Sequence, residues 1–305
     1  MQKIVAILGP TATGKTDLAL AIAKQIPADI ISVDSAMVYR GMDIGTAKPD
    51  TRVLQQAPHR LIDFLDPAVP YSTGQFCADA LREIRDIISH HRTPLLVGGT
   101  MLYFQKLLFG FAALPESDAV IRAQLSAEMK EQGLAAMHDR LKKSDPVAAL
   151  KIKPQDPQRI QRALEVFLTT GKKISELQMQ NQSGLLDEYD VTTIALIPEN
   201  RVWLHDRIAK RFDQMLAAGF IDEVKKLHAR CDLNATMPSM RIVGYRQAWE
   251  YLDGKTSLQT MREKAIAATR QLAKRQLTWL RRWPNLQVFD PEKTEVISQV
   301  MKKIV

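Results

Sequence analysis

The chain has 305 residues, of which 46% are hydrophobic and 25% charged, with a net charge of +8. These proportions are ordinary for a soluble globular protein of one large domain or two smaller ones. No apolar run approaches membrane-spanning length, which excludes an integral helical membrane protein. The two cysteines, Cys77 and Cys231, have no metal-ligand spacing, which argues against a zinc site. We expect a cytoplasmic protein without signal peptide or anchor, with a polyanion as a candidate partner.

A glycine-rich motif near the start organises the chain. It fits G-x-x-x-x-G-K-[ST] at every fixed position and lies between an apolar run, residues 4–8, and helical spacing over Asp17–Gln25. In such a loop the backbone N–H groups, the helix dipole and a lysine hold phosphate, and a hydroxyl can bind magnesium. The alternative is a glycine turn that caps a helix. We predict a phosphate site formed by Gly9, Pro10, Thr11, Ala12, Thr13, Gly14, Lys15 and Thr16, with Thr16 as a ligand of Mg²⁺.

Strand and helix patterns alternate after this loop. Short apolar runs predict strands over Asp29–Asp34, Arg60–Phe64 and Pro94–Val97, and helical spacing covers Gly74–His91 and Leu102–Leu108. Such alternation predicts an α/β fold: a parallel sheet with helices on both faces. Ligands then bind at the carboxyl ends of the strands. We therefore expect Gly9, Asp34 and Gly98 to converge on one site.

The strand pattern disappears from Pro115 until a further strand over Val191–Leu196, and the segment between them is predicted to be helical. One of its helices is well marked, because Asp156 can cap it and Gly171 can end it. Its apolar stripe places Arg159 and Arg162 away from the core. We expect a core beginning with residues 1–115, a helical insertion over 116–190, and a return to the core with a basic helical region over 191–305.

Two motifs of common phosphate-binding enzymes are missing from the chain, which argues against a GTPase and against many ATPases. The guanine motif Asn-Lys-x-Asp does not occur, and the strand over residues 94–97 ends in Gly98-Gly99-Thr100 rather than in a magnesium-binding acid. The acid at a strand end near the loop is Asp34. A small-molecule or nucleotide kinase could use Asp34 as the base on an acceptor hydroxyl. A kinase is therefore one possible function. A non-enzymatic RNA-binding protein is another, but it would leave the glycine-rich loop and Asp34 unexplained.

The chain resembles the tRNA dimethylallyltransferases over nearly its whole length. The resemblance is carried, in the family's order, by DSAMVYRGMDIGTAKP from Asp34, HRLID from His59, GGTMLY from Gly98, DPQRIQRALEV from Asp156, VGYRQ from Val243 and AKRQLTWLRR from Ala273.

This resemblance implies that the glycine-rich loop holds the diphosphate of dimethylallyl diphosphate rather than ATP, with Mg²⁺. The dimethylallyl group would move to the exocyclic N6 amine of the adenine immediately 3′ of the anticodon. Asp34 would be the general base, and Thr100 and Arg122 would contact the diphosphate. The structural alternatives are a turn cap or magnesium ligand for Asp34, a helix cap for Thr100 and an ordinary surface arginine for Arg122.

A second, basic surface must hold the RNA, because a stacked adenine has to be drawn out of the anticodon loop. Between Arg262 and Arg282 the chain carries seven basic residues against one acid, Glu263, with Trp279 and Trp283 among them. Trp279 and Tyr245 could instead belong to the core. We expect a monomer. The resemblance implies that it contacts the anticodon stem-loop through Asp34, Ser35, Ala36, Met37, Gln158, Arg159, Ile160, Gln161, Arg162, Arg241, Ile242, Val243, Gly244, Tyr245, Arg246, Lys274, Arg275, Gln276, Leu277, Thr278, Trp279, Leu280 and Arg281.

Overall fold

The computed structural model describes residues 1–110, 112, 114–180 and 183–304. The chain divides into two compact units, one formed by Met1–Leu107 with Glu188–Val305 and the other by Leu108–Asp187. The expected insertion over 116–190 overlaps most of the second unit. Among the described residues, no helix combines the length and the apolar character that crossing a membrane requires.

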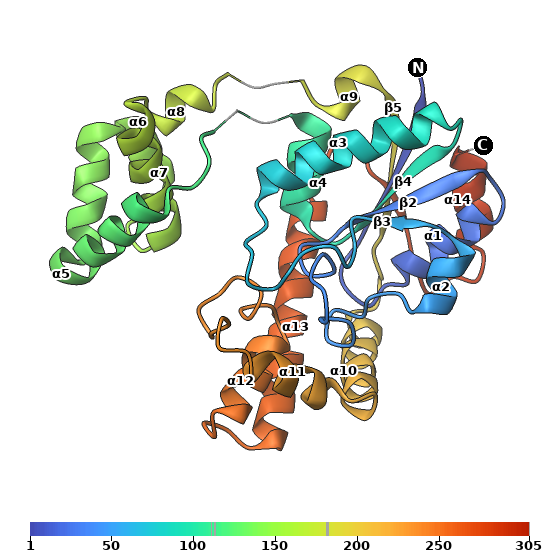
Figure 1. Ribbon diagram of the computed structural model, residues 1–305. Helices are drawn as coiled ribbons and strands as arrows, with labels where there is room; N and C mark the ends of the chain where they lie inside the picture. The colour runs from blue at the N-terminus through green and yellow to red at the C-terminus, as the bar shows by residue number, and fades with distance from the viewer. Residues whose placement is uncertain (111, 113, 181–182, 305) are drawn as a thin grey trace. The chain divides into compact units, whose positions relative to one another are not determined.

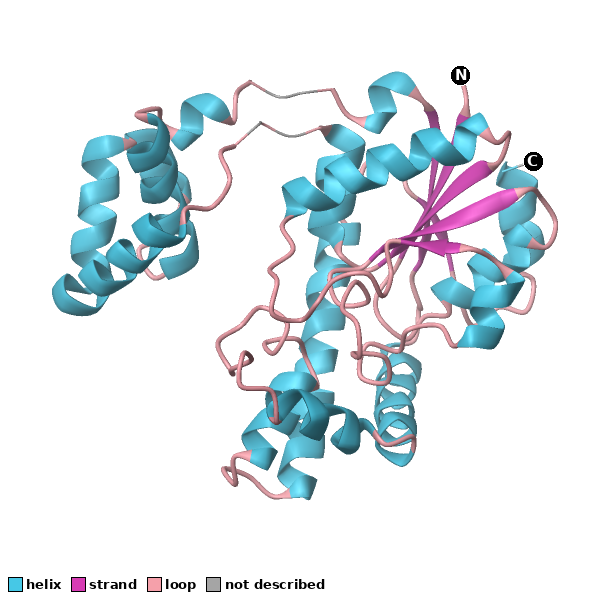
Figure 2. Ribbon diagram, viewed as in Figure 1, coloured by secondary structure: helices cyan, strands magenta, loops and turns pink. Residues whose placement is uncertain are grey.

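The first unit is built on a parallel sheet (Figure 2). Within the described residues it has six strands in the order β3-β2-β4-β1-β5-β6. These are β1 (Lys3–Leu8), β2 (Ala28–Val33), β3 (His59–Arg60), β4 (Thr93–Gly98), β5 (Asp190–Leu196) and β6 (Gln287–Phe289). The central strands are buried almost throughout, because helices cover both faces, and this explains their unbroken apolar runs. The predicted α/β fold with a parallel sheet is confirmed.

Helices cover the two faces of this sheet (Figure 1). Helix α1 (Lys15–Ala23) and helix α14 (Val296–Ile304) pack on one face, over a cluster that includes Val5, Ile7 and Leu95. Helix α3 (Thr73–Ser89) and helix α4 (Met101–Phe109) lie on the other, where Phe76 stacks on Tyr103 with 4.2 Å between ring centroids. The short helix α2 (Thr51–Gln56) connects β2 to β3.

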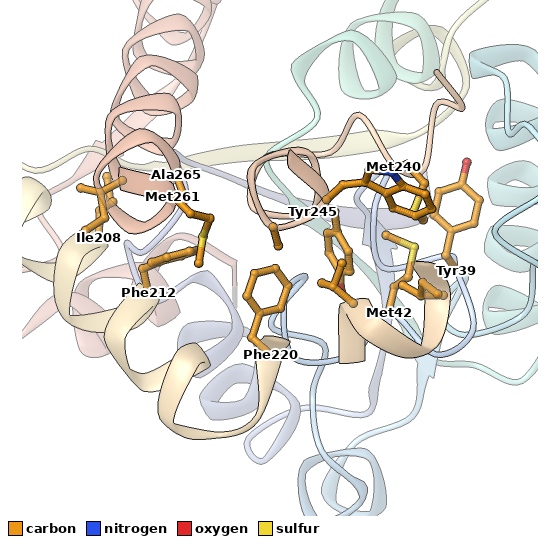
Figure 3. Close-up of a cluster of buried hydrophobic side chains, with 14 of the residues drawn as sticks. Tyr39, Met42, Ile208, Phe212, Phe220, Met240, Tyr245, Met261 and Ala265 are labelled. Atoms are coloured by element: carbon orange, nitrogen blue, oxygen red, sulfur yellow. The ribbon is translucent and has the colours of Figure 1, made fainter. Parts of the chain in front are cut away.

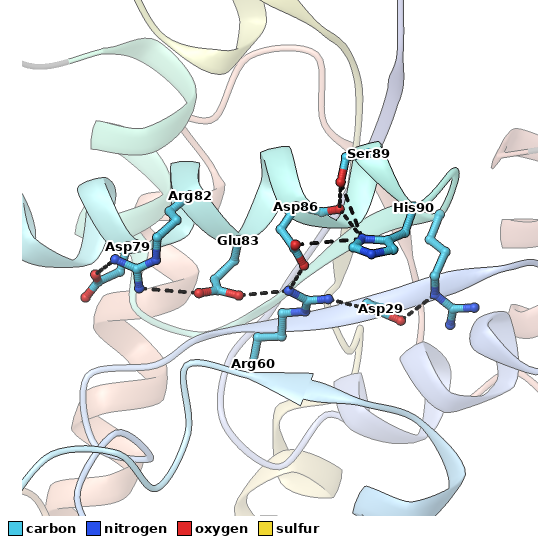
Figure 4. A network of polar contacts seen from close by, with 9 residues as sticks. Asp29, Arg60, Asp79, Arg82, Glu83, Asp86, Ser89 and His90 are labelled. Carbon is cyan, nitrogen blue, oxygen red and sulfur yellow. Dashed lines mark hydrogen bonds and ion pairs between the residues drawn. The ribbon is translucent and has the colours of Figure 1, made fainter.

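The strand predicted over Arg60–Phe64 is wrong beyond its first residue. Leu61 and Asp63 have positive φ angles of 60° and 57°, and the N–H of Asp63 donates to the carbonyl of Met37 rather than to a strand. Arg60 explains the early end, because its guanidinium forms ion pairs with Asp29, Glu83 and Asp86 (Figure 4). These pairs fix β3 at the sheet edge, while the following residues turn toward the segment after β2.

The four helices between β5 and β6 form a helical layer that begins below the carboxyl ends of the strands, and its last helix rises past those ends (Figure 1). They are α10 (Arg201–Ala217), α11 (Phe220–His228), α12 (Tyr245–Leu252) and α13 (Leu258–Leu280). Gly219, with a φ of 96°, separates α10 from α11. Their shared core contains Phe212, Phe220 and Tyr245 and also takes in Tyr39 and Met42 from the segment after β2 (Figure 3).

The second unit is a small helical bundle. It contains α5 (Ala119–Ser144), α6 (Pro146–Lys151), α7 (Pro157–Thr170) and α8 (Ile174–Leu177), and α9 (Leu185–Glu188) leads out of it. Its core is apolar and includes Leu125, Met137 and Ile160. Asp156 caps α7 and Gly171 ends it in the left-handed conformation, so the predicted bounds of this helix are confirmed.

Candidate active site

The glycine-rich loop joins β1 to α1 as the sequence predicts. Gly14 has a φ of 82°, which L side chains rarely adopt. Gly9 is needed for a different reason: a Cβ there would come within 2.9 Å of the carbonyl oxygen of Leu196 and 3.0 Å of Oγ1 of Thr13. The loop therefore fits closely against the end of β5, and the hydroxyl of Thr13 donates to the carbonyl of Pro10 at 2.9 Å.

Lys15 folds over this loop. Its Nζ donates to the carbonyl of Pro10 at 2.7 Å. Burial, followed by the nearby charge of Arg211, lowers the pKa of Lys15 to about 7, while the carboxylate of Asp34 acts in the opposite direction. A buried ammonium beside a guanidinium is stabilised by an anion, so this end of the sheet is suited to a ligand with several negative charges.

Two arginines of α10 complete the basic side of the site. The Nε of Arg207 donates to the carbonyl of Ala12 at 2.8 Å, and its guanidinium lies 4.7 Å from the ring centroid of Trp203. Burial lowers the pKa of Arg211, and the charges of Asp34, Arg207 and Asp17 also act on it. Neither arginine was among the site residues predicted from the sequence. Their signal was the i, i+4 spacing on one side of a helix, which any amphipathic surface helix also shows.

Asp34 lies at the end of β2, next to this basic group. Its Oδ1 accepts the backbone N–H groups of Ala36 at 2.8 Å and of Met37 at 3.3 Å. Its charge acts on both Lys15 and Arg211. In the described residues no hydrogen bond is found to Oδ2 of Asp34. One carboxylate oxygen is thus held by the turn, while the other remains free to accept a proton.

The end of β4 closes against the ends of β1 and β2. A Cβ on Gly98 would lie 2.0 Å from the carbonyl oxygen of Val33, and one on Gly99 would lie 3.4 Å from that of Gly9. The backbone N–H of Ser35 donates to Oγ1 of Thr100 at 3.1 Å. These contacts confirm the predicted convergence of the three strand ends, and Thr100 ties the segment after β4 to the segment after β2.

The residues expected to hold RNA on α13 fall into two sets. Four side chains of the helix are exposed, as is Arg281 directly after it, and Trp279 has 38% of its surface exposed. Gln276 and Leu280 are buried, and Leu277 is half-buried. Gln276 faces the site instead of solvent. The exposed set in the helix is Lys274, Arg275, Thr278 and Trp279.

The segment over 241–246 is divided in the same way. Arg241 and Arg246 are exposed, Ile242 and Val243 are half-buried, and Gly244 is buried. Tyr245 is fully buried among the aromatic side chains of the helical layer (Figure 3). Its ring stands edge-on to that of Phe220 with centroids 5.2 Å apart. Of the two interpretations of Tyr245, the structure supports the one that places it in the core.

Arg122 and the residues over 158–162 belong to the second unit and are described within it. Arg122 and Arg162 both pair with the carboxylate of Glu165, at 3.3 Å and 2.9 Å, and the Glu165 side chain is fully buried. The expectation that Arg162 faces away from the core is therefore wrong, since 25% of its side chain is exposed and it serves the buried acid. Glu165 lies among the apolar residues on the buried face of α7, and nothing in the sequence indicated that an acid there would be buried.

Other members of this segment differ in exposure. Arg159 is open, with 73% of its side chain exposed, and lies 3.4 Å from Asp156. Gln158 is exposed, Ile160 is fully buried, and Gln161 donates to the carbonyl of Arg122 and to the hydroxyl of Ser126. Gln158 and Arg159 are the side chains here that a partner could reach directly.

The family model described as IPP transferase matches residues 37–283. The chain belongs to the IPP transferase family. A protein of Coxiella burnetii named tRNA dimethylallyltransferase is 56% identical over 98% of this chain and 96% of its own.

Solved structures of the family agree with this assignment. The tRNA isopentenylpyrophosphate transferase of Bacillus halodurans is 37% identical, with a TM-score of 0.72 over 100% of this chain and 96% of that one. A eukaryotic dimethylallyltransferase acting on tRNA is 25% identical, with a TM-score of 0.84 over 99% of this chain and 78% of that one. The IPP transferase fold thus extends over the whole of this chain.

Proposed function

We propose that this enzyme transfers the dimethylallyl group of dimethylallyl diphosphate to the exocyclic N6 amine of the adenine 3′-adjacent to the anticodon in tRNA. Diphosphate is the other product. One observation carries the proposal: Asp34 follows the end of β2, and its charge acts on Lys15, which follows the loop after β1, and on Arg211 of α10. A leaving anion and a nucleophile that must lose a proton require these two kinds of group side by side.

The basic side of the site serves the leaving group. As the allylic carbon–oxygen bond breaks, its electron pair goes to the diphosphate, whose negative charge increases. Loop amides and the charges of Lys15 and Arg211 stabilise that charge best when it is fully developed, which lowers the barrier. The hydrogen bond from Arg207 to Ala12 holds the loop in the shape that this requires.

Asp34 serves the nucleophile. The amine forms the new nitrogen–carbon bond and then carries an extra proton, which Oδ2 of Asp34 accepts. The turn amides of Ala36 and Met37 keep the other oxygen in place, so the carboxylate does not need to reorient during the reaction. Ser35, Ala36 and Met37 directly follow the proposed base and would contact the adenine and its neighbours.

We propose Mg²⁺ as an ion that arrives with the diphosphate. The described residues contain no group of three or more His, Cys, Asp or Glu side chains that could hold a metal. Magnesium commonly keeps water and takes phosphate oxygens with one or two protein ligands, and the hydroxyl of Thr16 would be such a ligand. The ion supplies further neutralisation of the diphosphate charge.

The exposed basic side chains of α13 and of the segment over 241–246 would hold the RNA backbone, while Trp279 offers an aromatic surface for a base. Drawing the adenine out of its stack requires such a hold on the anticodon stem-loop. Gln158 and Arg159 of the second unit would add contacts to the RNA, and Arg122 keeps its predicted role as a contact of the diphosphate. We expect the enzyme to act as a monomer in the cytoplasm.

The test uses unmodified tRNA incubated with protein, magnesium and dimethylallyl diphosphate, followed by mass spectrometry of the nucleosides. A parallel reaction contains ATP, and Lys15→Ala is compared with the wild type in both. We expect N6-dimethylallyladenosine with dimethylallyl diphosphate and a sharp loss of it in Lys15→Ala, while tRNA binding largely survives. Phosphate transfer from ATP at an enzymatic rate would instead support the kinase. Unchanged turnover of Lys15→Ala would disprove the assigned diphosphate site.

A further inference from the structure

Gln276 joins α13 to two loops of the active site. Its Oε1 accepts the backbone N–H of Thr11 at 3.0 Å, and its Nε2 donates to the carbonyl of Gly99 at 2.8 Å. The partner groups also fix which end of the amide is which, because an N–H needs an acceptor and a carbonyl needs a donor. Gln276 therefore bridges the loop after β1 and the loop after β4.

The Gln276 side chain is buried and packs closely against the loop after β4. Gln276 is 7% exposed, while its neighbours Lys274 and Arg275 are exposed. A Cβ on Gly99 would lie 2.5 Å from Nε2 of Gln276, so a larger residue at position 99 would displace the amide. A buried amide bonded at both ends holds its two partners at a fixed separation, because either bond is costly to lose in a site shielded from water.

Two side chains from different helices bind the glycine-rich loop, and Gln276 is the one on α13. Arg207 bonds the carbonyl of Ala12 from α10, and Gln276 bonds the N–H of Thr11 from α13. The glycine-rich loop is thus tied to two helices at consecutive residues. From Gly99 the connection continues to Thr100, whose hydroxyl accepts the N–H of Ser35 beside the base.

We propose that Gln276 is a positioning residue for the diphosphate: through Thr11 and Gly99 it fixes the phosphate-binding loop relative to Thr100 and Asp34. This inference rests on the proposed function of that loop. The residue does not touch the reacting atoms itself. It sets the distance between the group that holds the leaving diphosphate and the group that takes the proton, and it does so from the same helix that presents Lys274 and Arg275 to the RNA.

The test compares Gln276→Met, which keeps length but removes both hydrogen bonds, with Gln271→Met, an exposed glutamine of the same helix. Binding of inorganic diphosphate with magnesium, the KM for dimethylallyl diphosphate, kcat and tRNA affinity are measured separately. Gln276→Met should weaken diphosphate binding and kcat/KM by roughly 10- to 100-fold, the worth of two such bonds. Its tRNA affinity and the behaviour of Gln271→Met should stay near wild type. Unchanged diphosphate binding in Gln276→Met would overturn the inference.

A local readout separates positioning from general stability. Exchange of the Thr11 amide hydrogen, followed by NMR, should accelerate roughly tenfold or more in Gln276→Met and not in Gln271→Met. Unaltered exchange would overturn the inference. Gln276→Glu keeps an acceptor for Thr11, so it should retain the protection while its added charge repels diphosphate. Wild-type diphosphate affinity in Gln276→Glu would also contradict the inference.

Lys15→Ala distinguishes the positioning role from the proposed function. If diphosphate binding is indifferent to Lys15→Ala, the assigned diphosphate site fails, and the inference drawn from it fails with it. If binding depends on Lys15 and not on Gln276, the proposed function stands and the positioning role alone is disproved. The expected result is dependence on both.

Discussion

Tyr245 donates a 2.5 Å hydrogen bond from its hydroxyl to Oε1 of Glu223, across the boundary between α12 and α11. The same carboxylate accepts the backbone N–H groups of Asp43, Ile44 and Gly45 at 2.7 to 3.0 Å. A Cβ on Gly45 would lie 2.6 Å from the Tyr245 ring, so the chain passes directly over the aromatic core. Glu223 thereby fixes the segment after β2, the one that begins with Asp34, on the helical layer.

The first prediction concerns this carboxylate. Glu223→Ala leaves three backbone N–H groups and a buried hydroxyl without their acceptor, so we expect a loss of several kcal/mol in the free energy of unfolding, at roughly 1–3 kcal/mol per unsatisfied group. Tyr245→Phe removes one bond and should cost about 1 kcal/mol. Urea unfolding measures both. The control is Asp222→Ala, whose side chain is exposed. An effect of Glu223→Ala no larger than that of Asp222→Ala would contradict this account.

The second prediction concerns the helical insertion. Asp145 caps α6 and is buried: its Oδ1 accepts the N–H of Ala148 and the hydroxyl of Ser175, and its Oδ2 accepts the N–H of Ser175. Burial raises the pKa of Asp145, but these hydrogen bonds outweigh burial and leave the pKa below its ordinary value of 3.8. A lowered pKa means that the folded state favours the carboxylate. The resulting stabilisation is complete above pH 3.8 and is lost as the pH falls through the folded-state pKa.

We therefore expect Asp145→Asn to destabilise the full-length protein at neutral pH by roughly 1–3 kcal/mol, since one of its acceptor atoms becomes a donor. The difference from wild type should shrink below pH 3.8. Urea unfolding at a series of pH values, with fluorescence of a probe attached in the insertion, measures this. The matched control is Asp139→Asn, whose carboxylate is exposed. If the stability difference between Asp145→Asn and wild type grew on acidification, the lowered pKa of Asp145 would not be the cause of that difference.

Local patterns in the sequence were enough to predict the strands β1, β2, β4 and β5, the glycine-rich loop between β1 and α1, and the ends of α7, whereas β6 was not predicted. In each case the signal lies within about ten residues: an apolar run, a glycine spacing, a cap and a terminating glycine. The strand over Arg60–Phe64 failed because its end is decided by distant partners. Arg60 binds Asp29 on β2 and acids on α3, which no local pattern reveals.

Distant partners also explain why the roles of Gln276 and Arg207 in the site were not predicted from the sequence. Gln276 meets Thr11 across 265 positions, and Arg207 meets Ala12 across 195. Buried polar residues on amphipathic helices look like ordinary surface residues in sequence, since composition does not say which partner they meet. The resemblance placed Gln276 among the RNA-binding residues. In the structure both ends of its amide are occupied by the loops of the active site.

The third prediction concerns RNA binding by α13. Lys274, Arg275 and Arg281 are exposed, and a cation that neutralises a phosphate releases a counterion. Neutralising all three should weaken tRNA binding and reduce the slope of log affinity against log salt by roughly 0.7–0.9 for each phosphate that no longer meets a cation. Filter binding at several salt concentrations measures the slope. Neutralising Lys302 and Lys303 on α14 is the control for charge in general. An unaltered slope in the triple variant would mean that these side chains do not touch phosphate.

The last prediction separates chemistry from binding at Asp34. The exocyclic amine of adenine is a poor nucleophile, because its lone pair is drawn into the ring, and it becomes acidic only as the new bond forms. A base must therefore stand within about 3 Å of it in the transition state. Oδ1 of Asp34 is held by the amides of Ala36 and Met37, which leaves Oδ2 for this task.

Asp34→Asn keeps the shape and the oxygen that the turn amides bind, but it loses most of the basicity. Turnover should fall by roughly 10²- to 10⁴-fold, the usual worth of general acid–base catalysis. Binding of tRNA and of dimethylallyl diphosphate, measured separately, should change little. Single-turnover rates on the preformed complex isolate the chemical step from association. Near-normal turnover would remove Asp34 as the base. Poor tRNA binding combined with a normal single-turnover rate would give Asp34 the task of placing the adenine, and the base would have to be sought elsewhere.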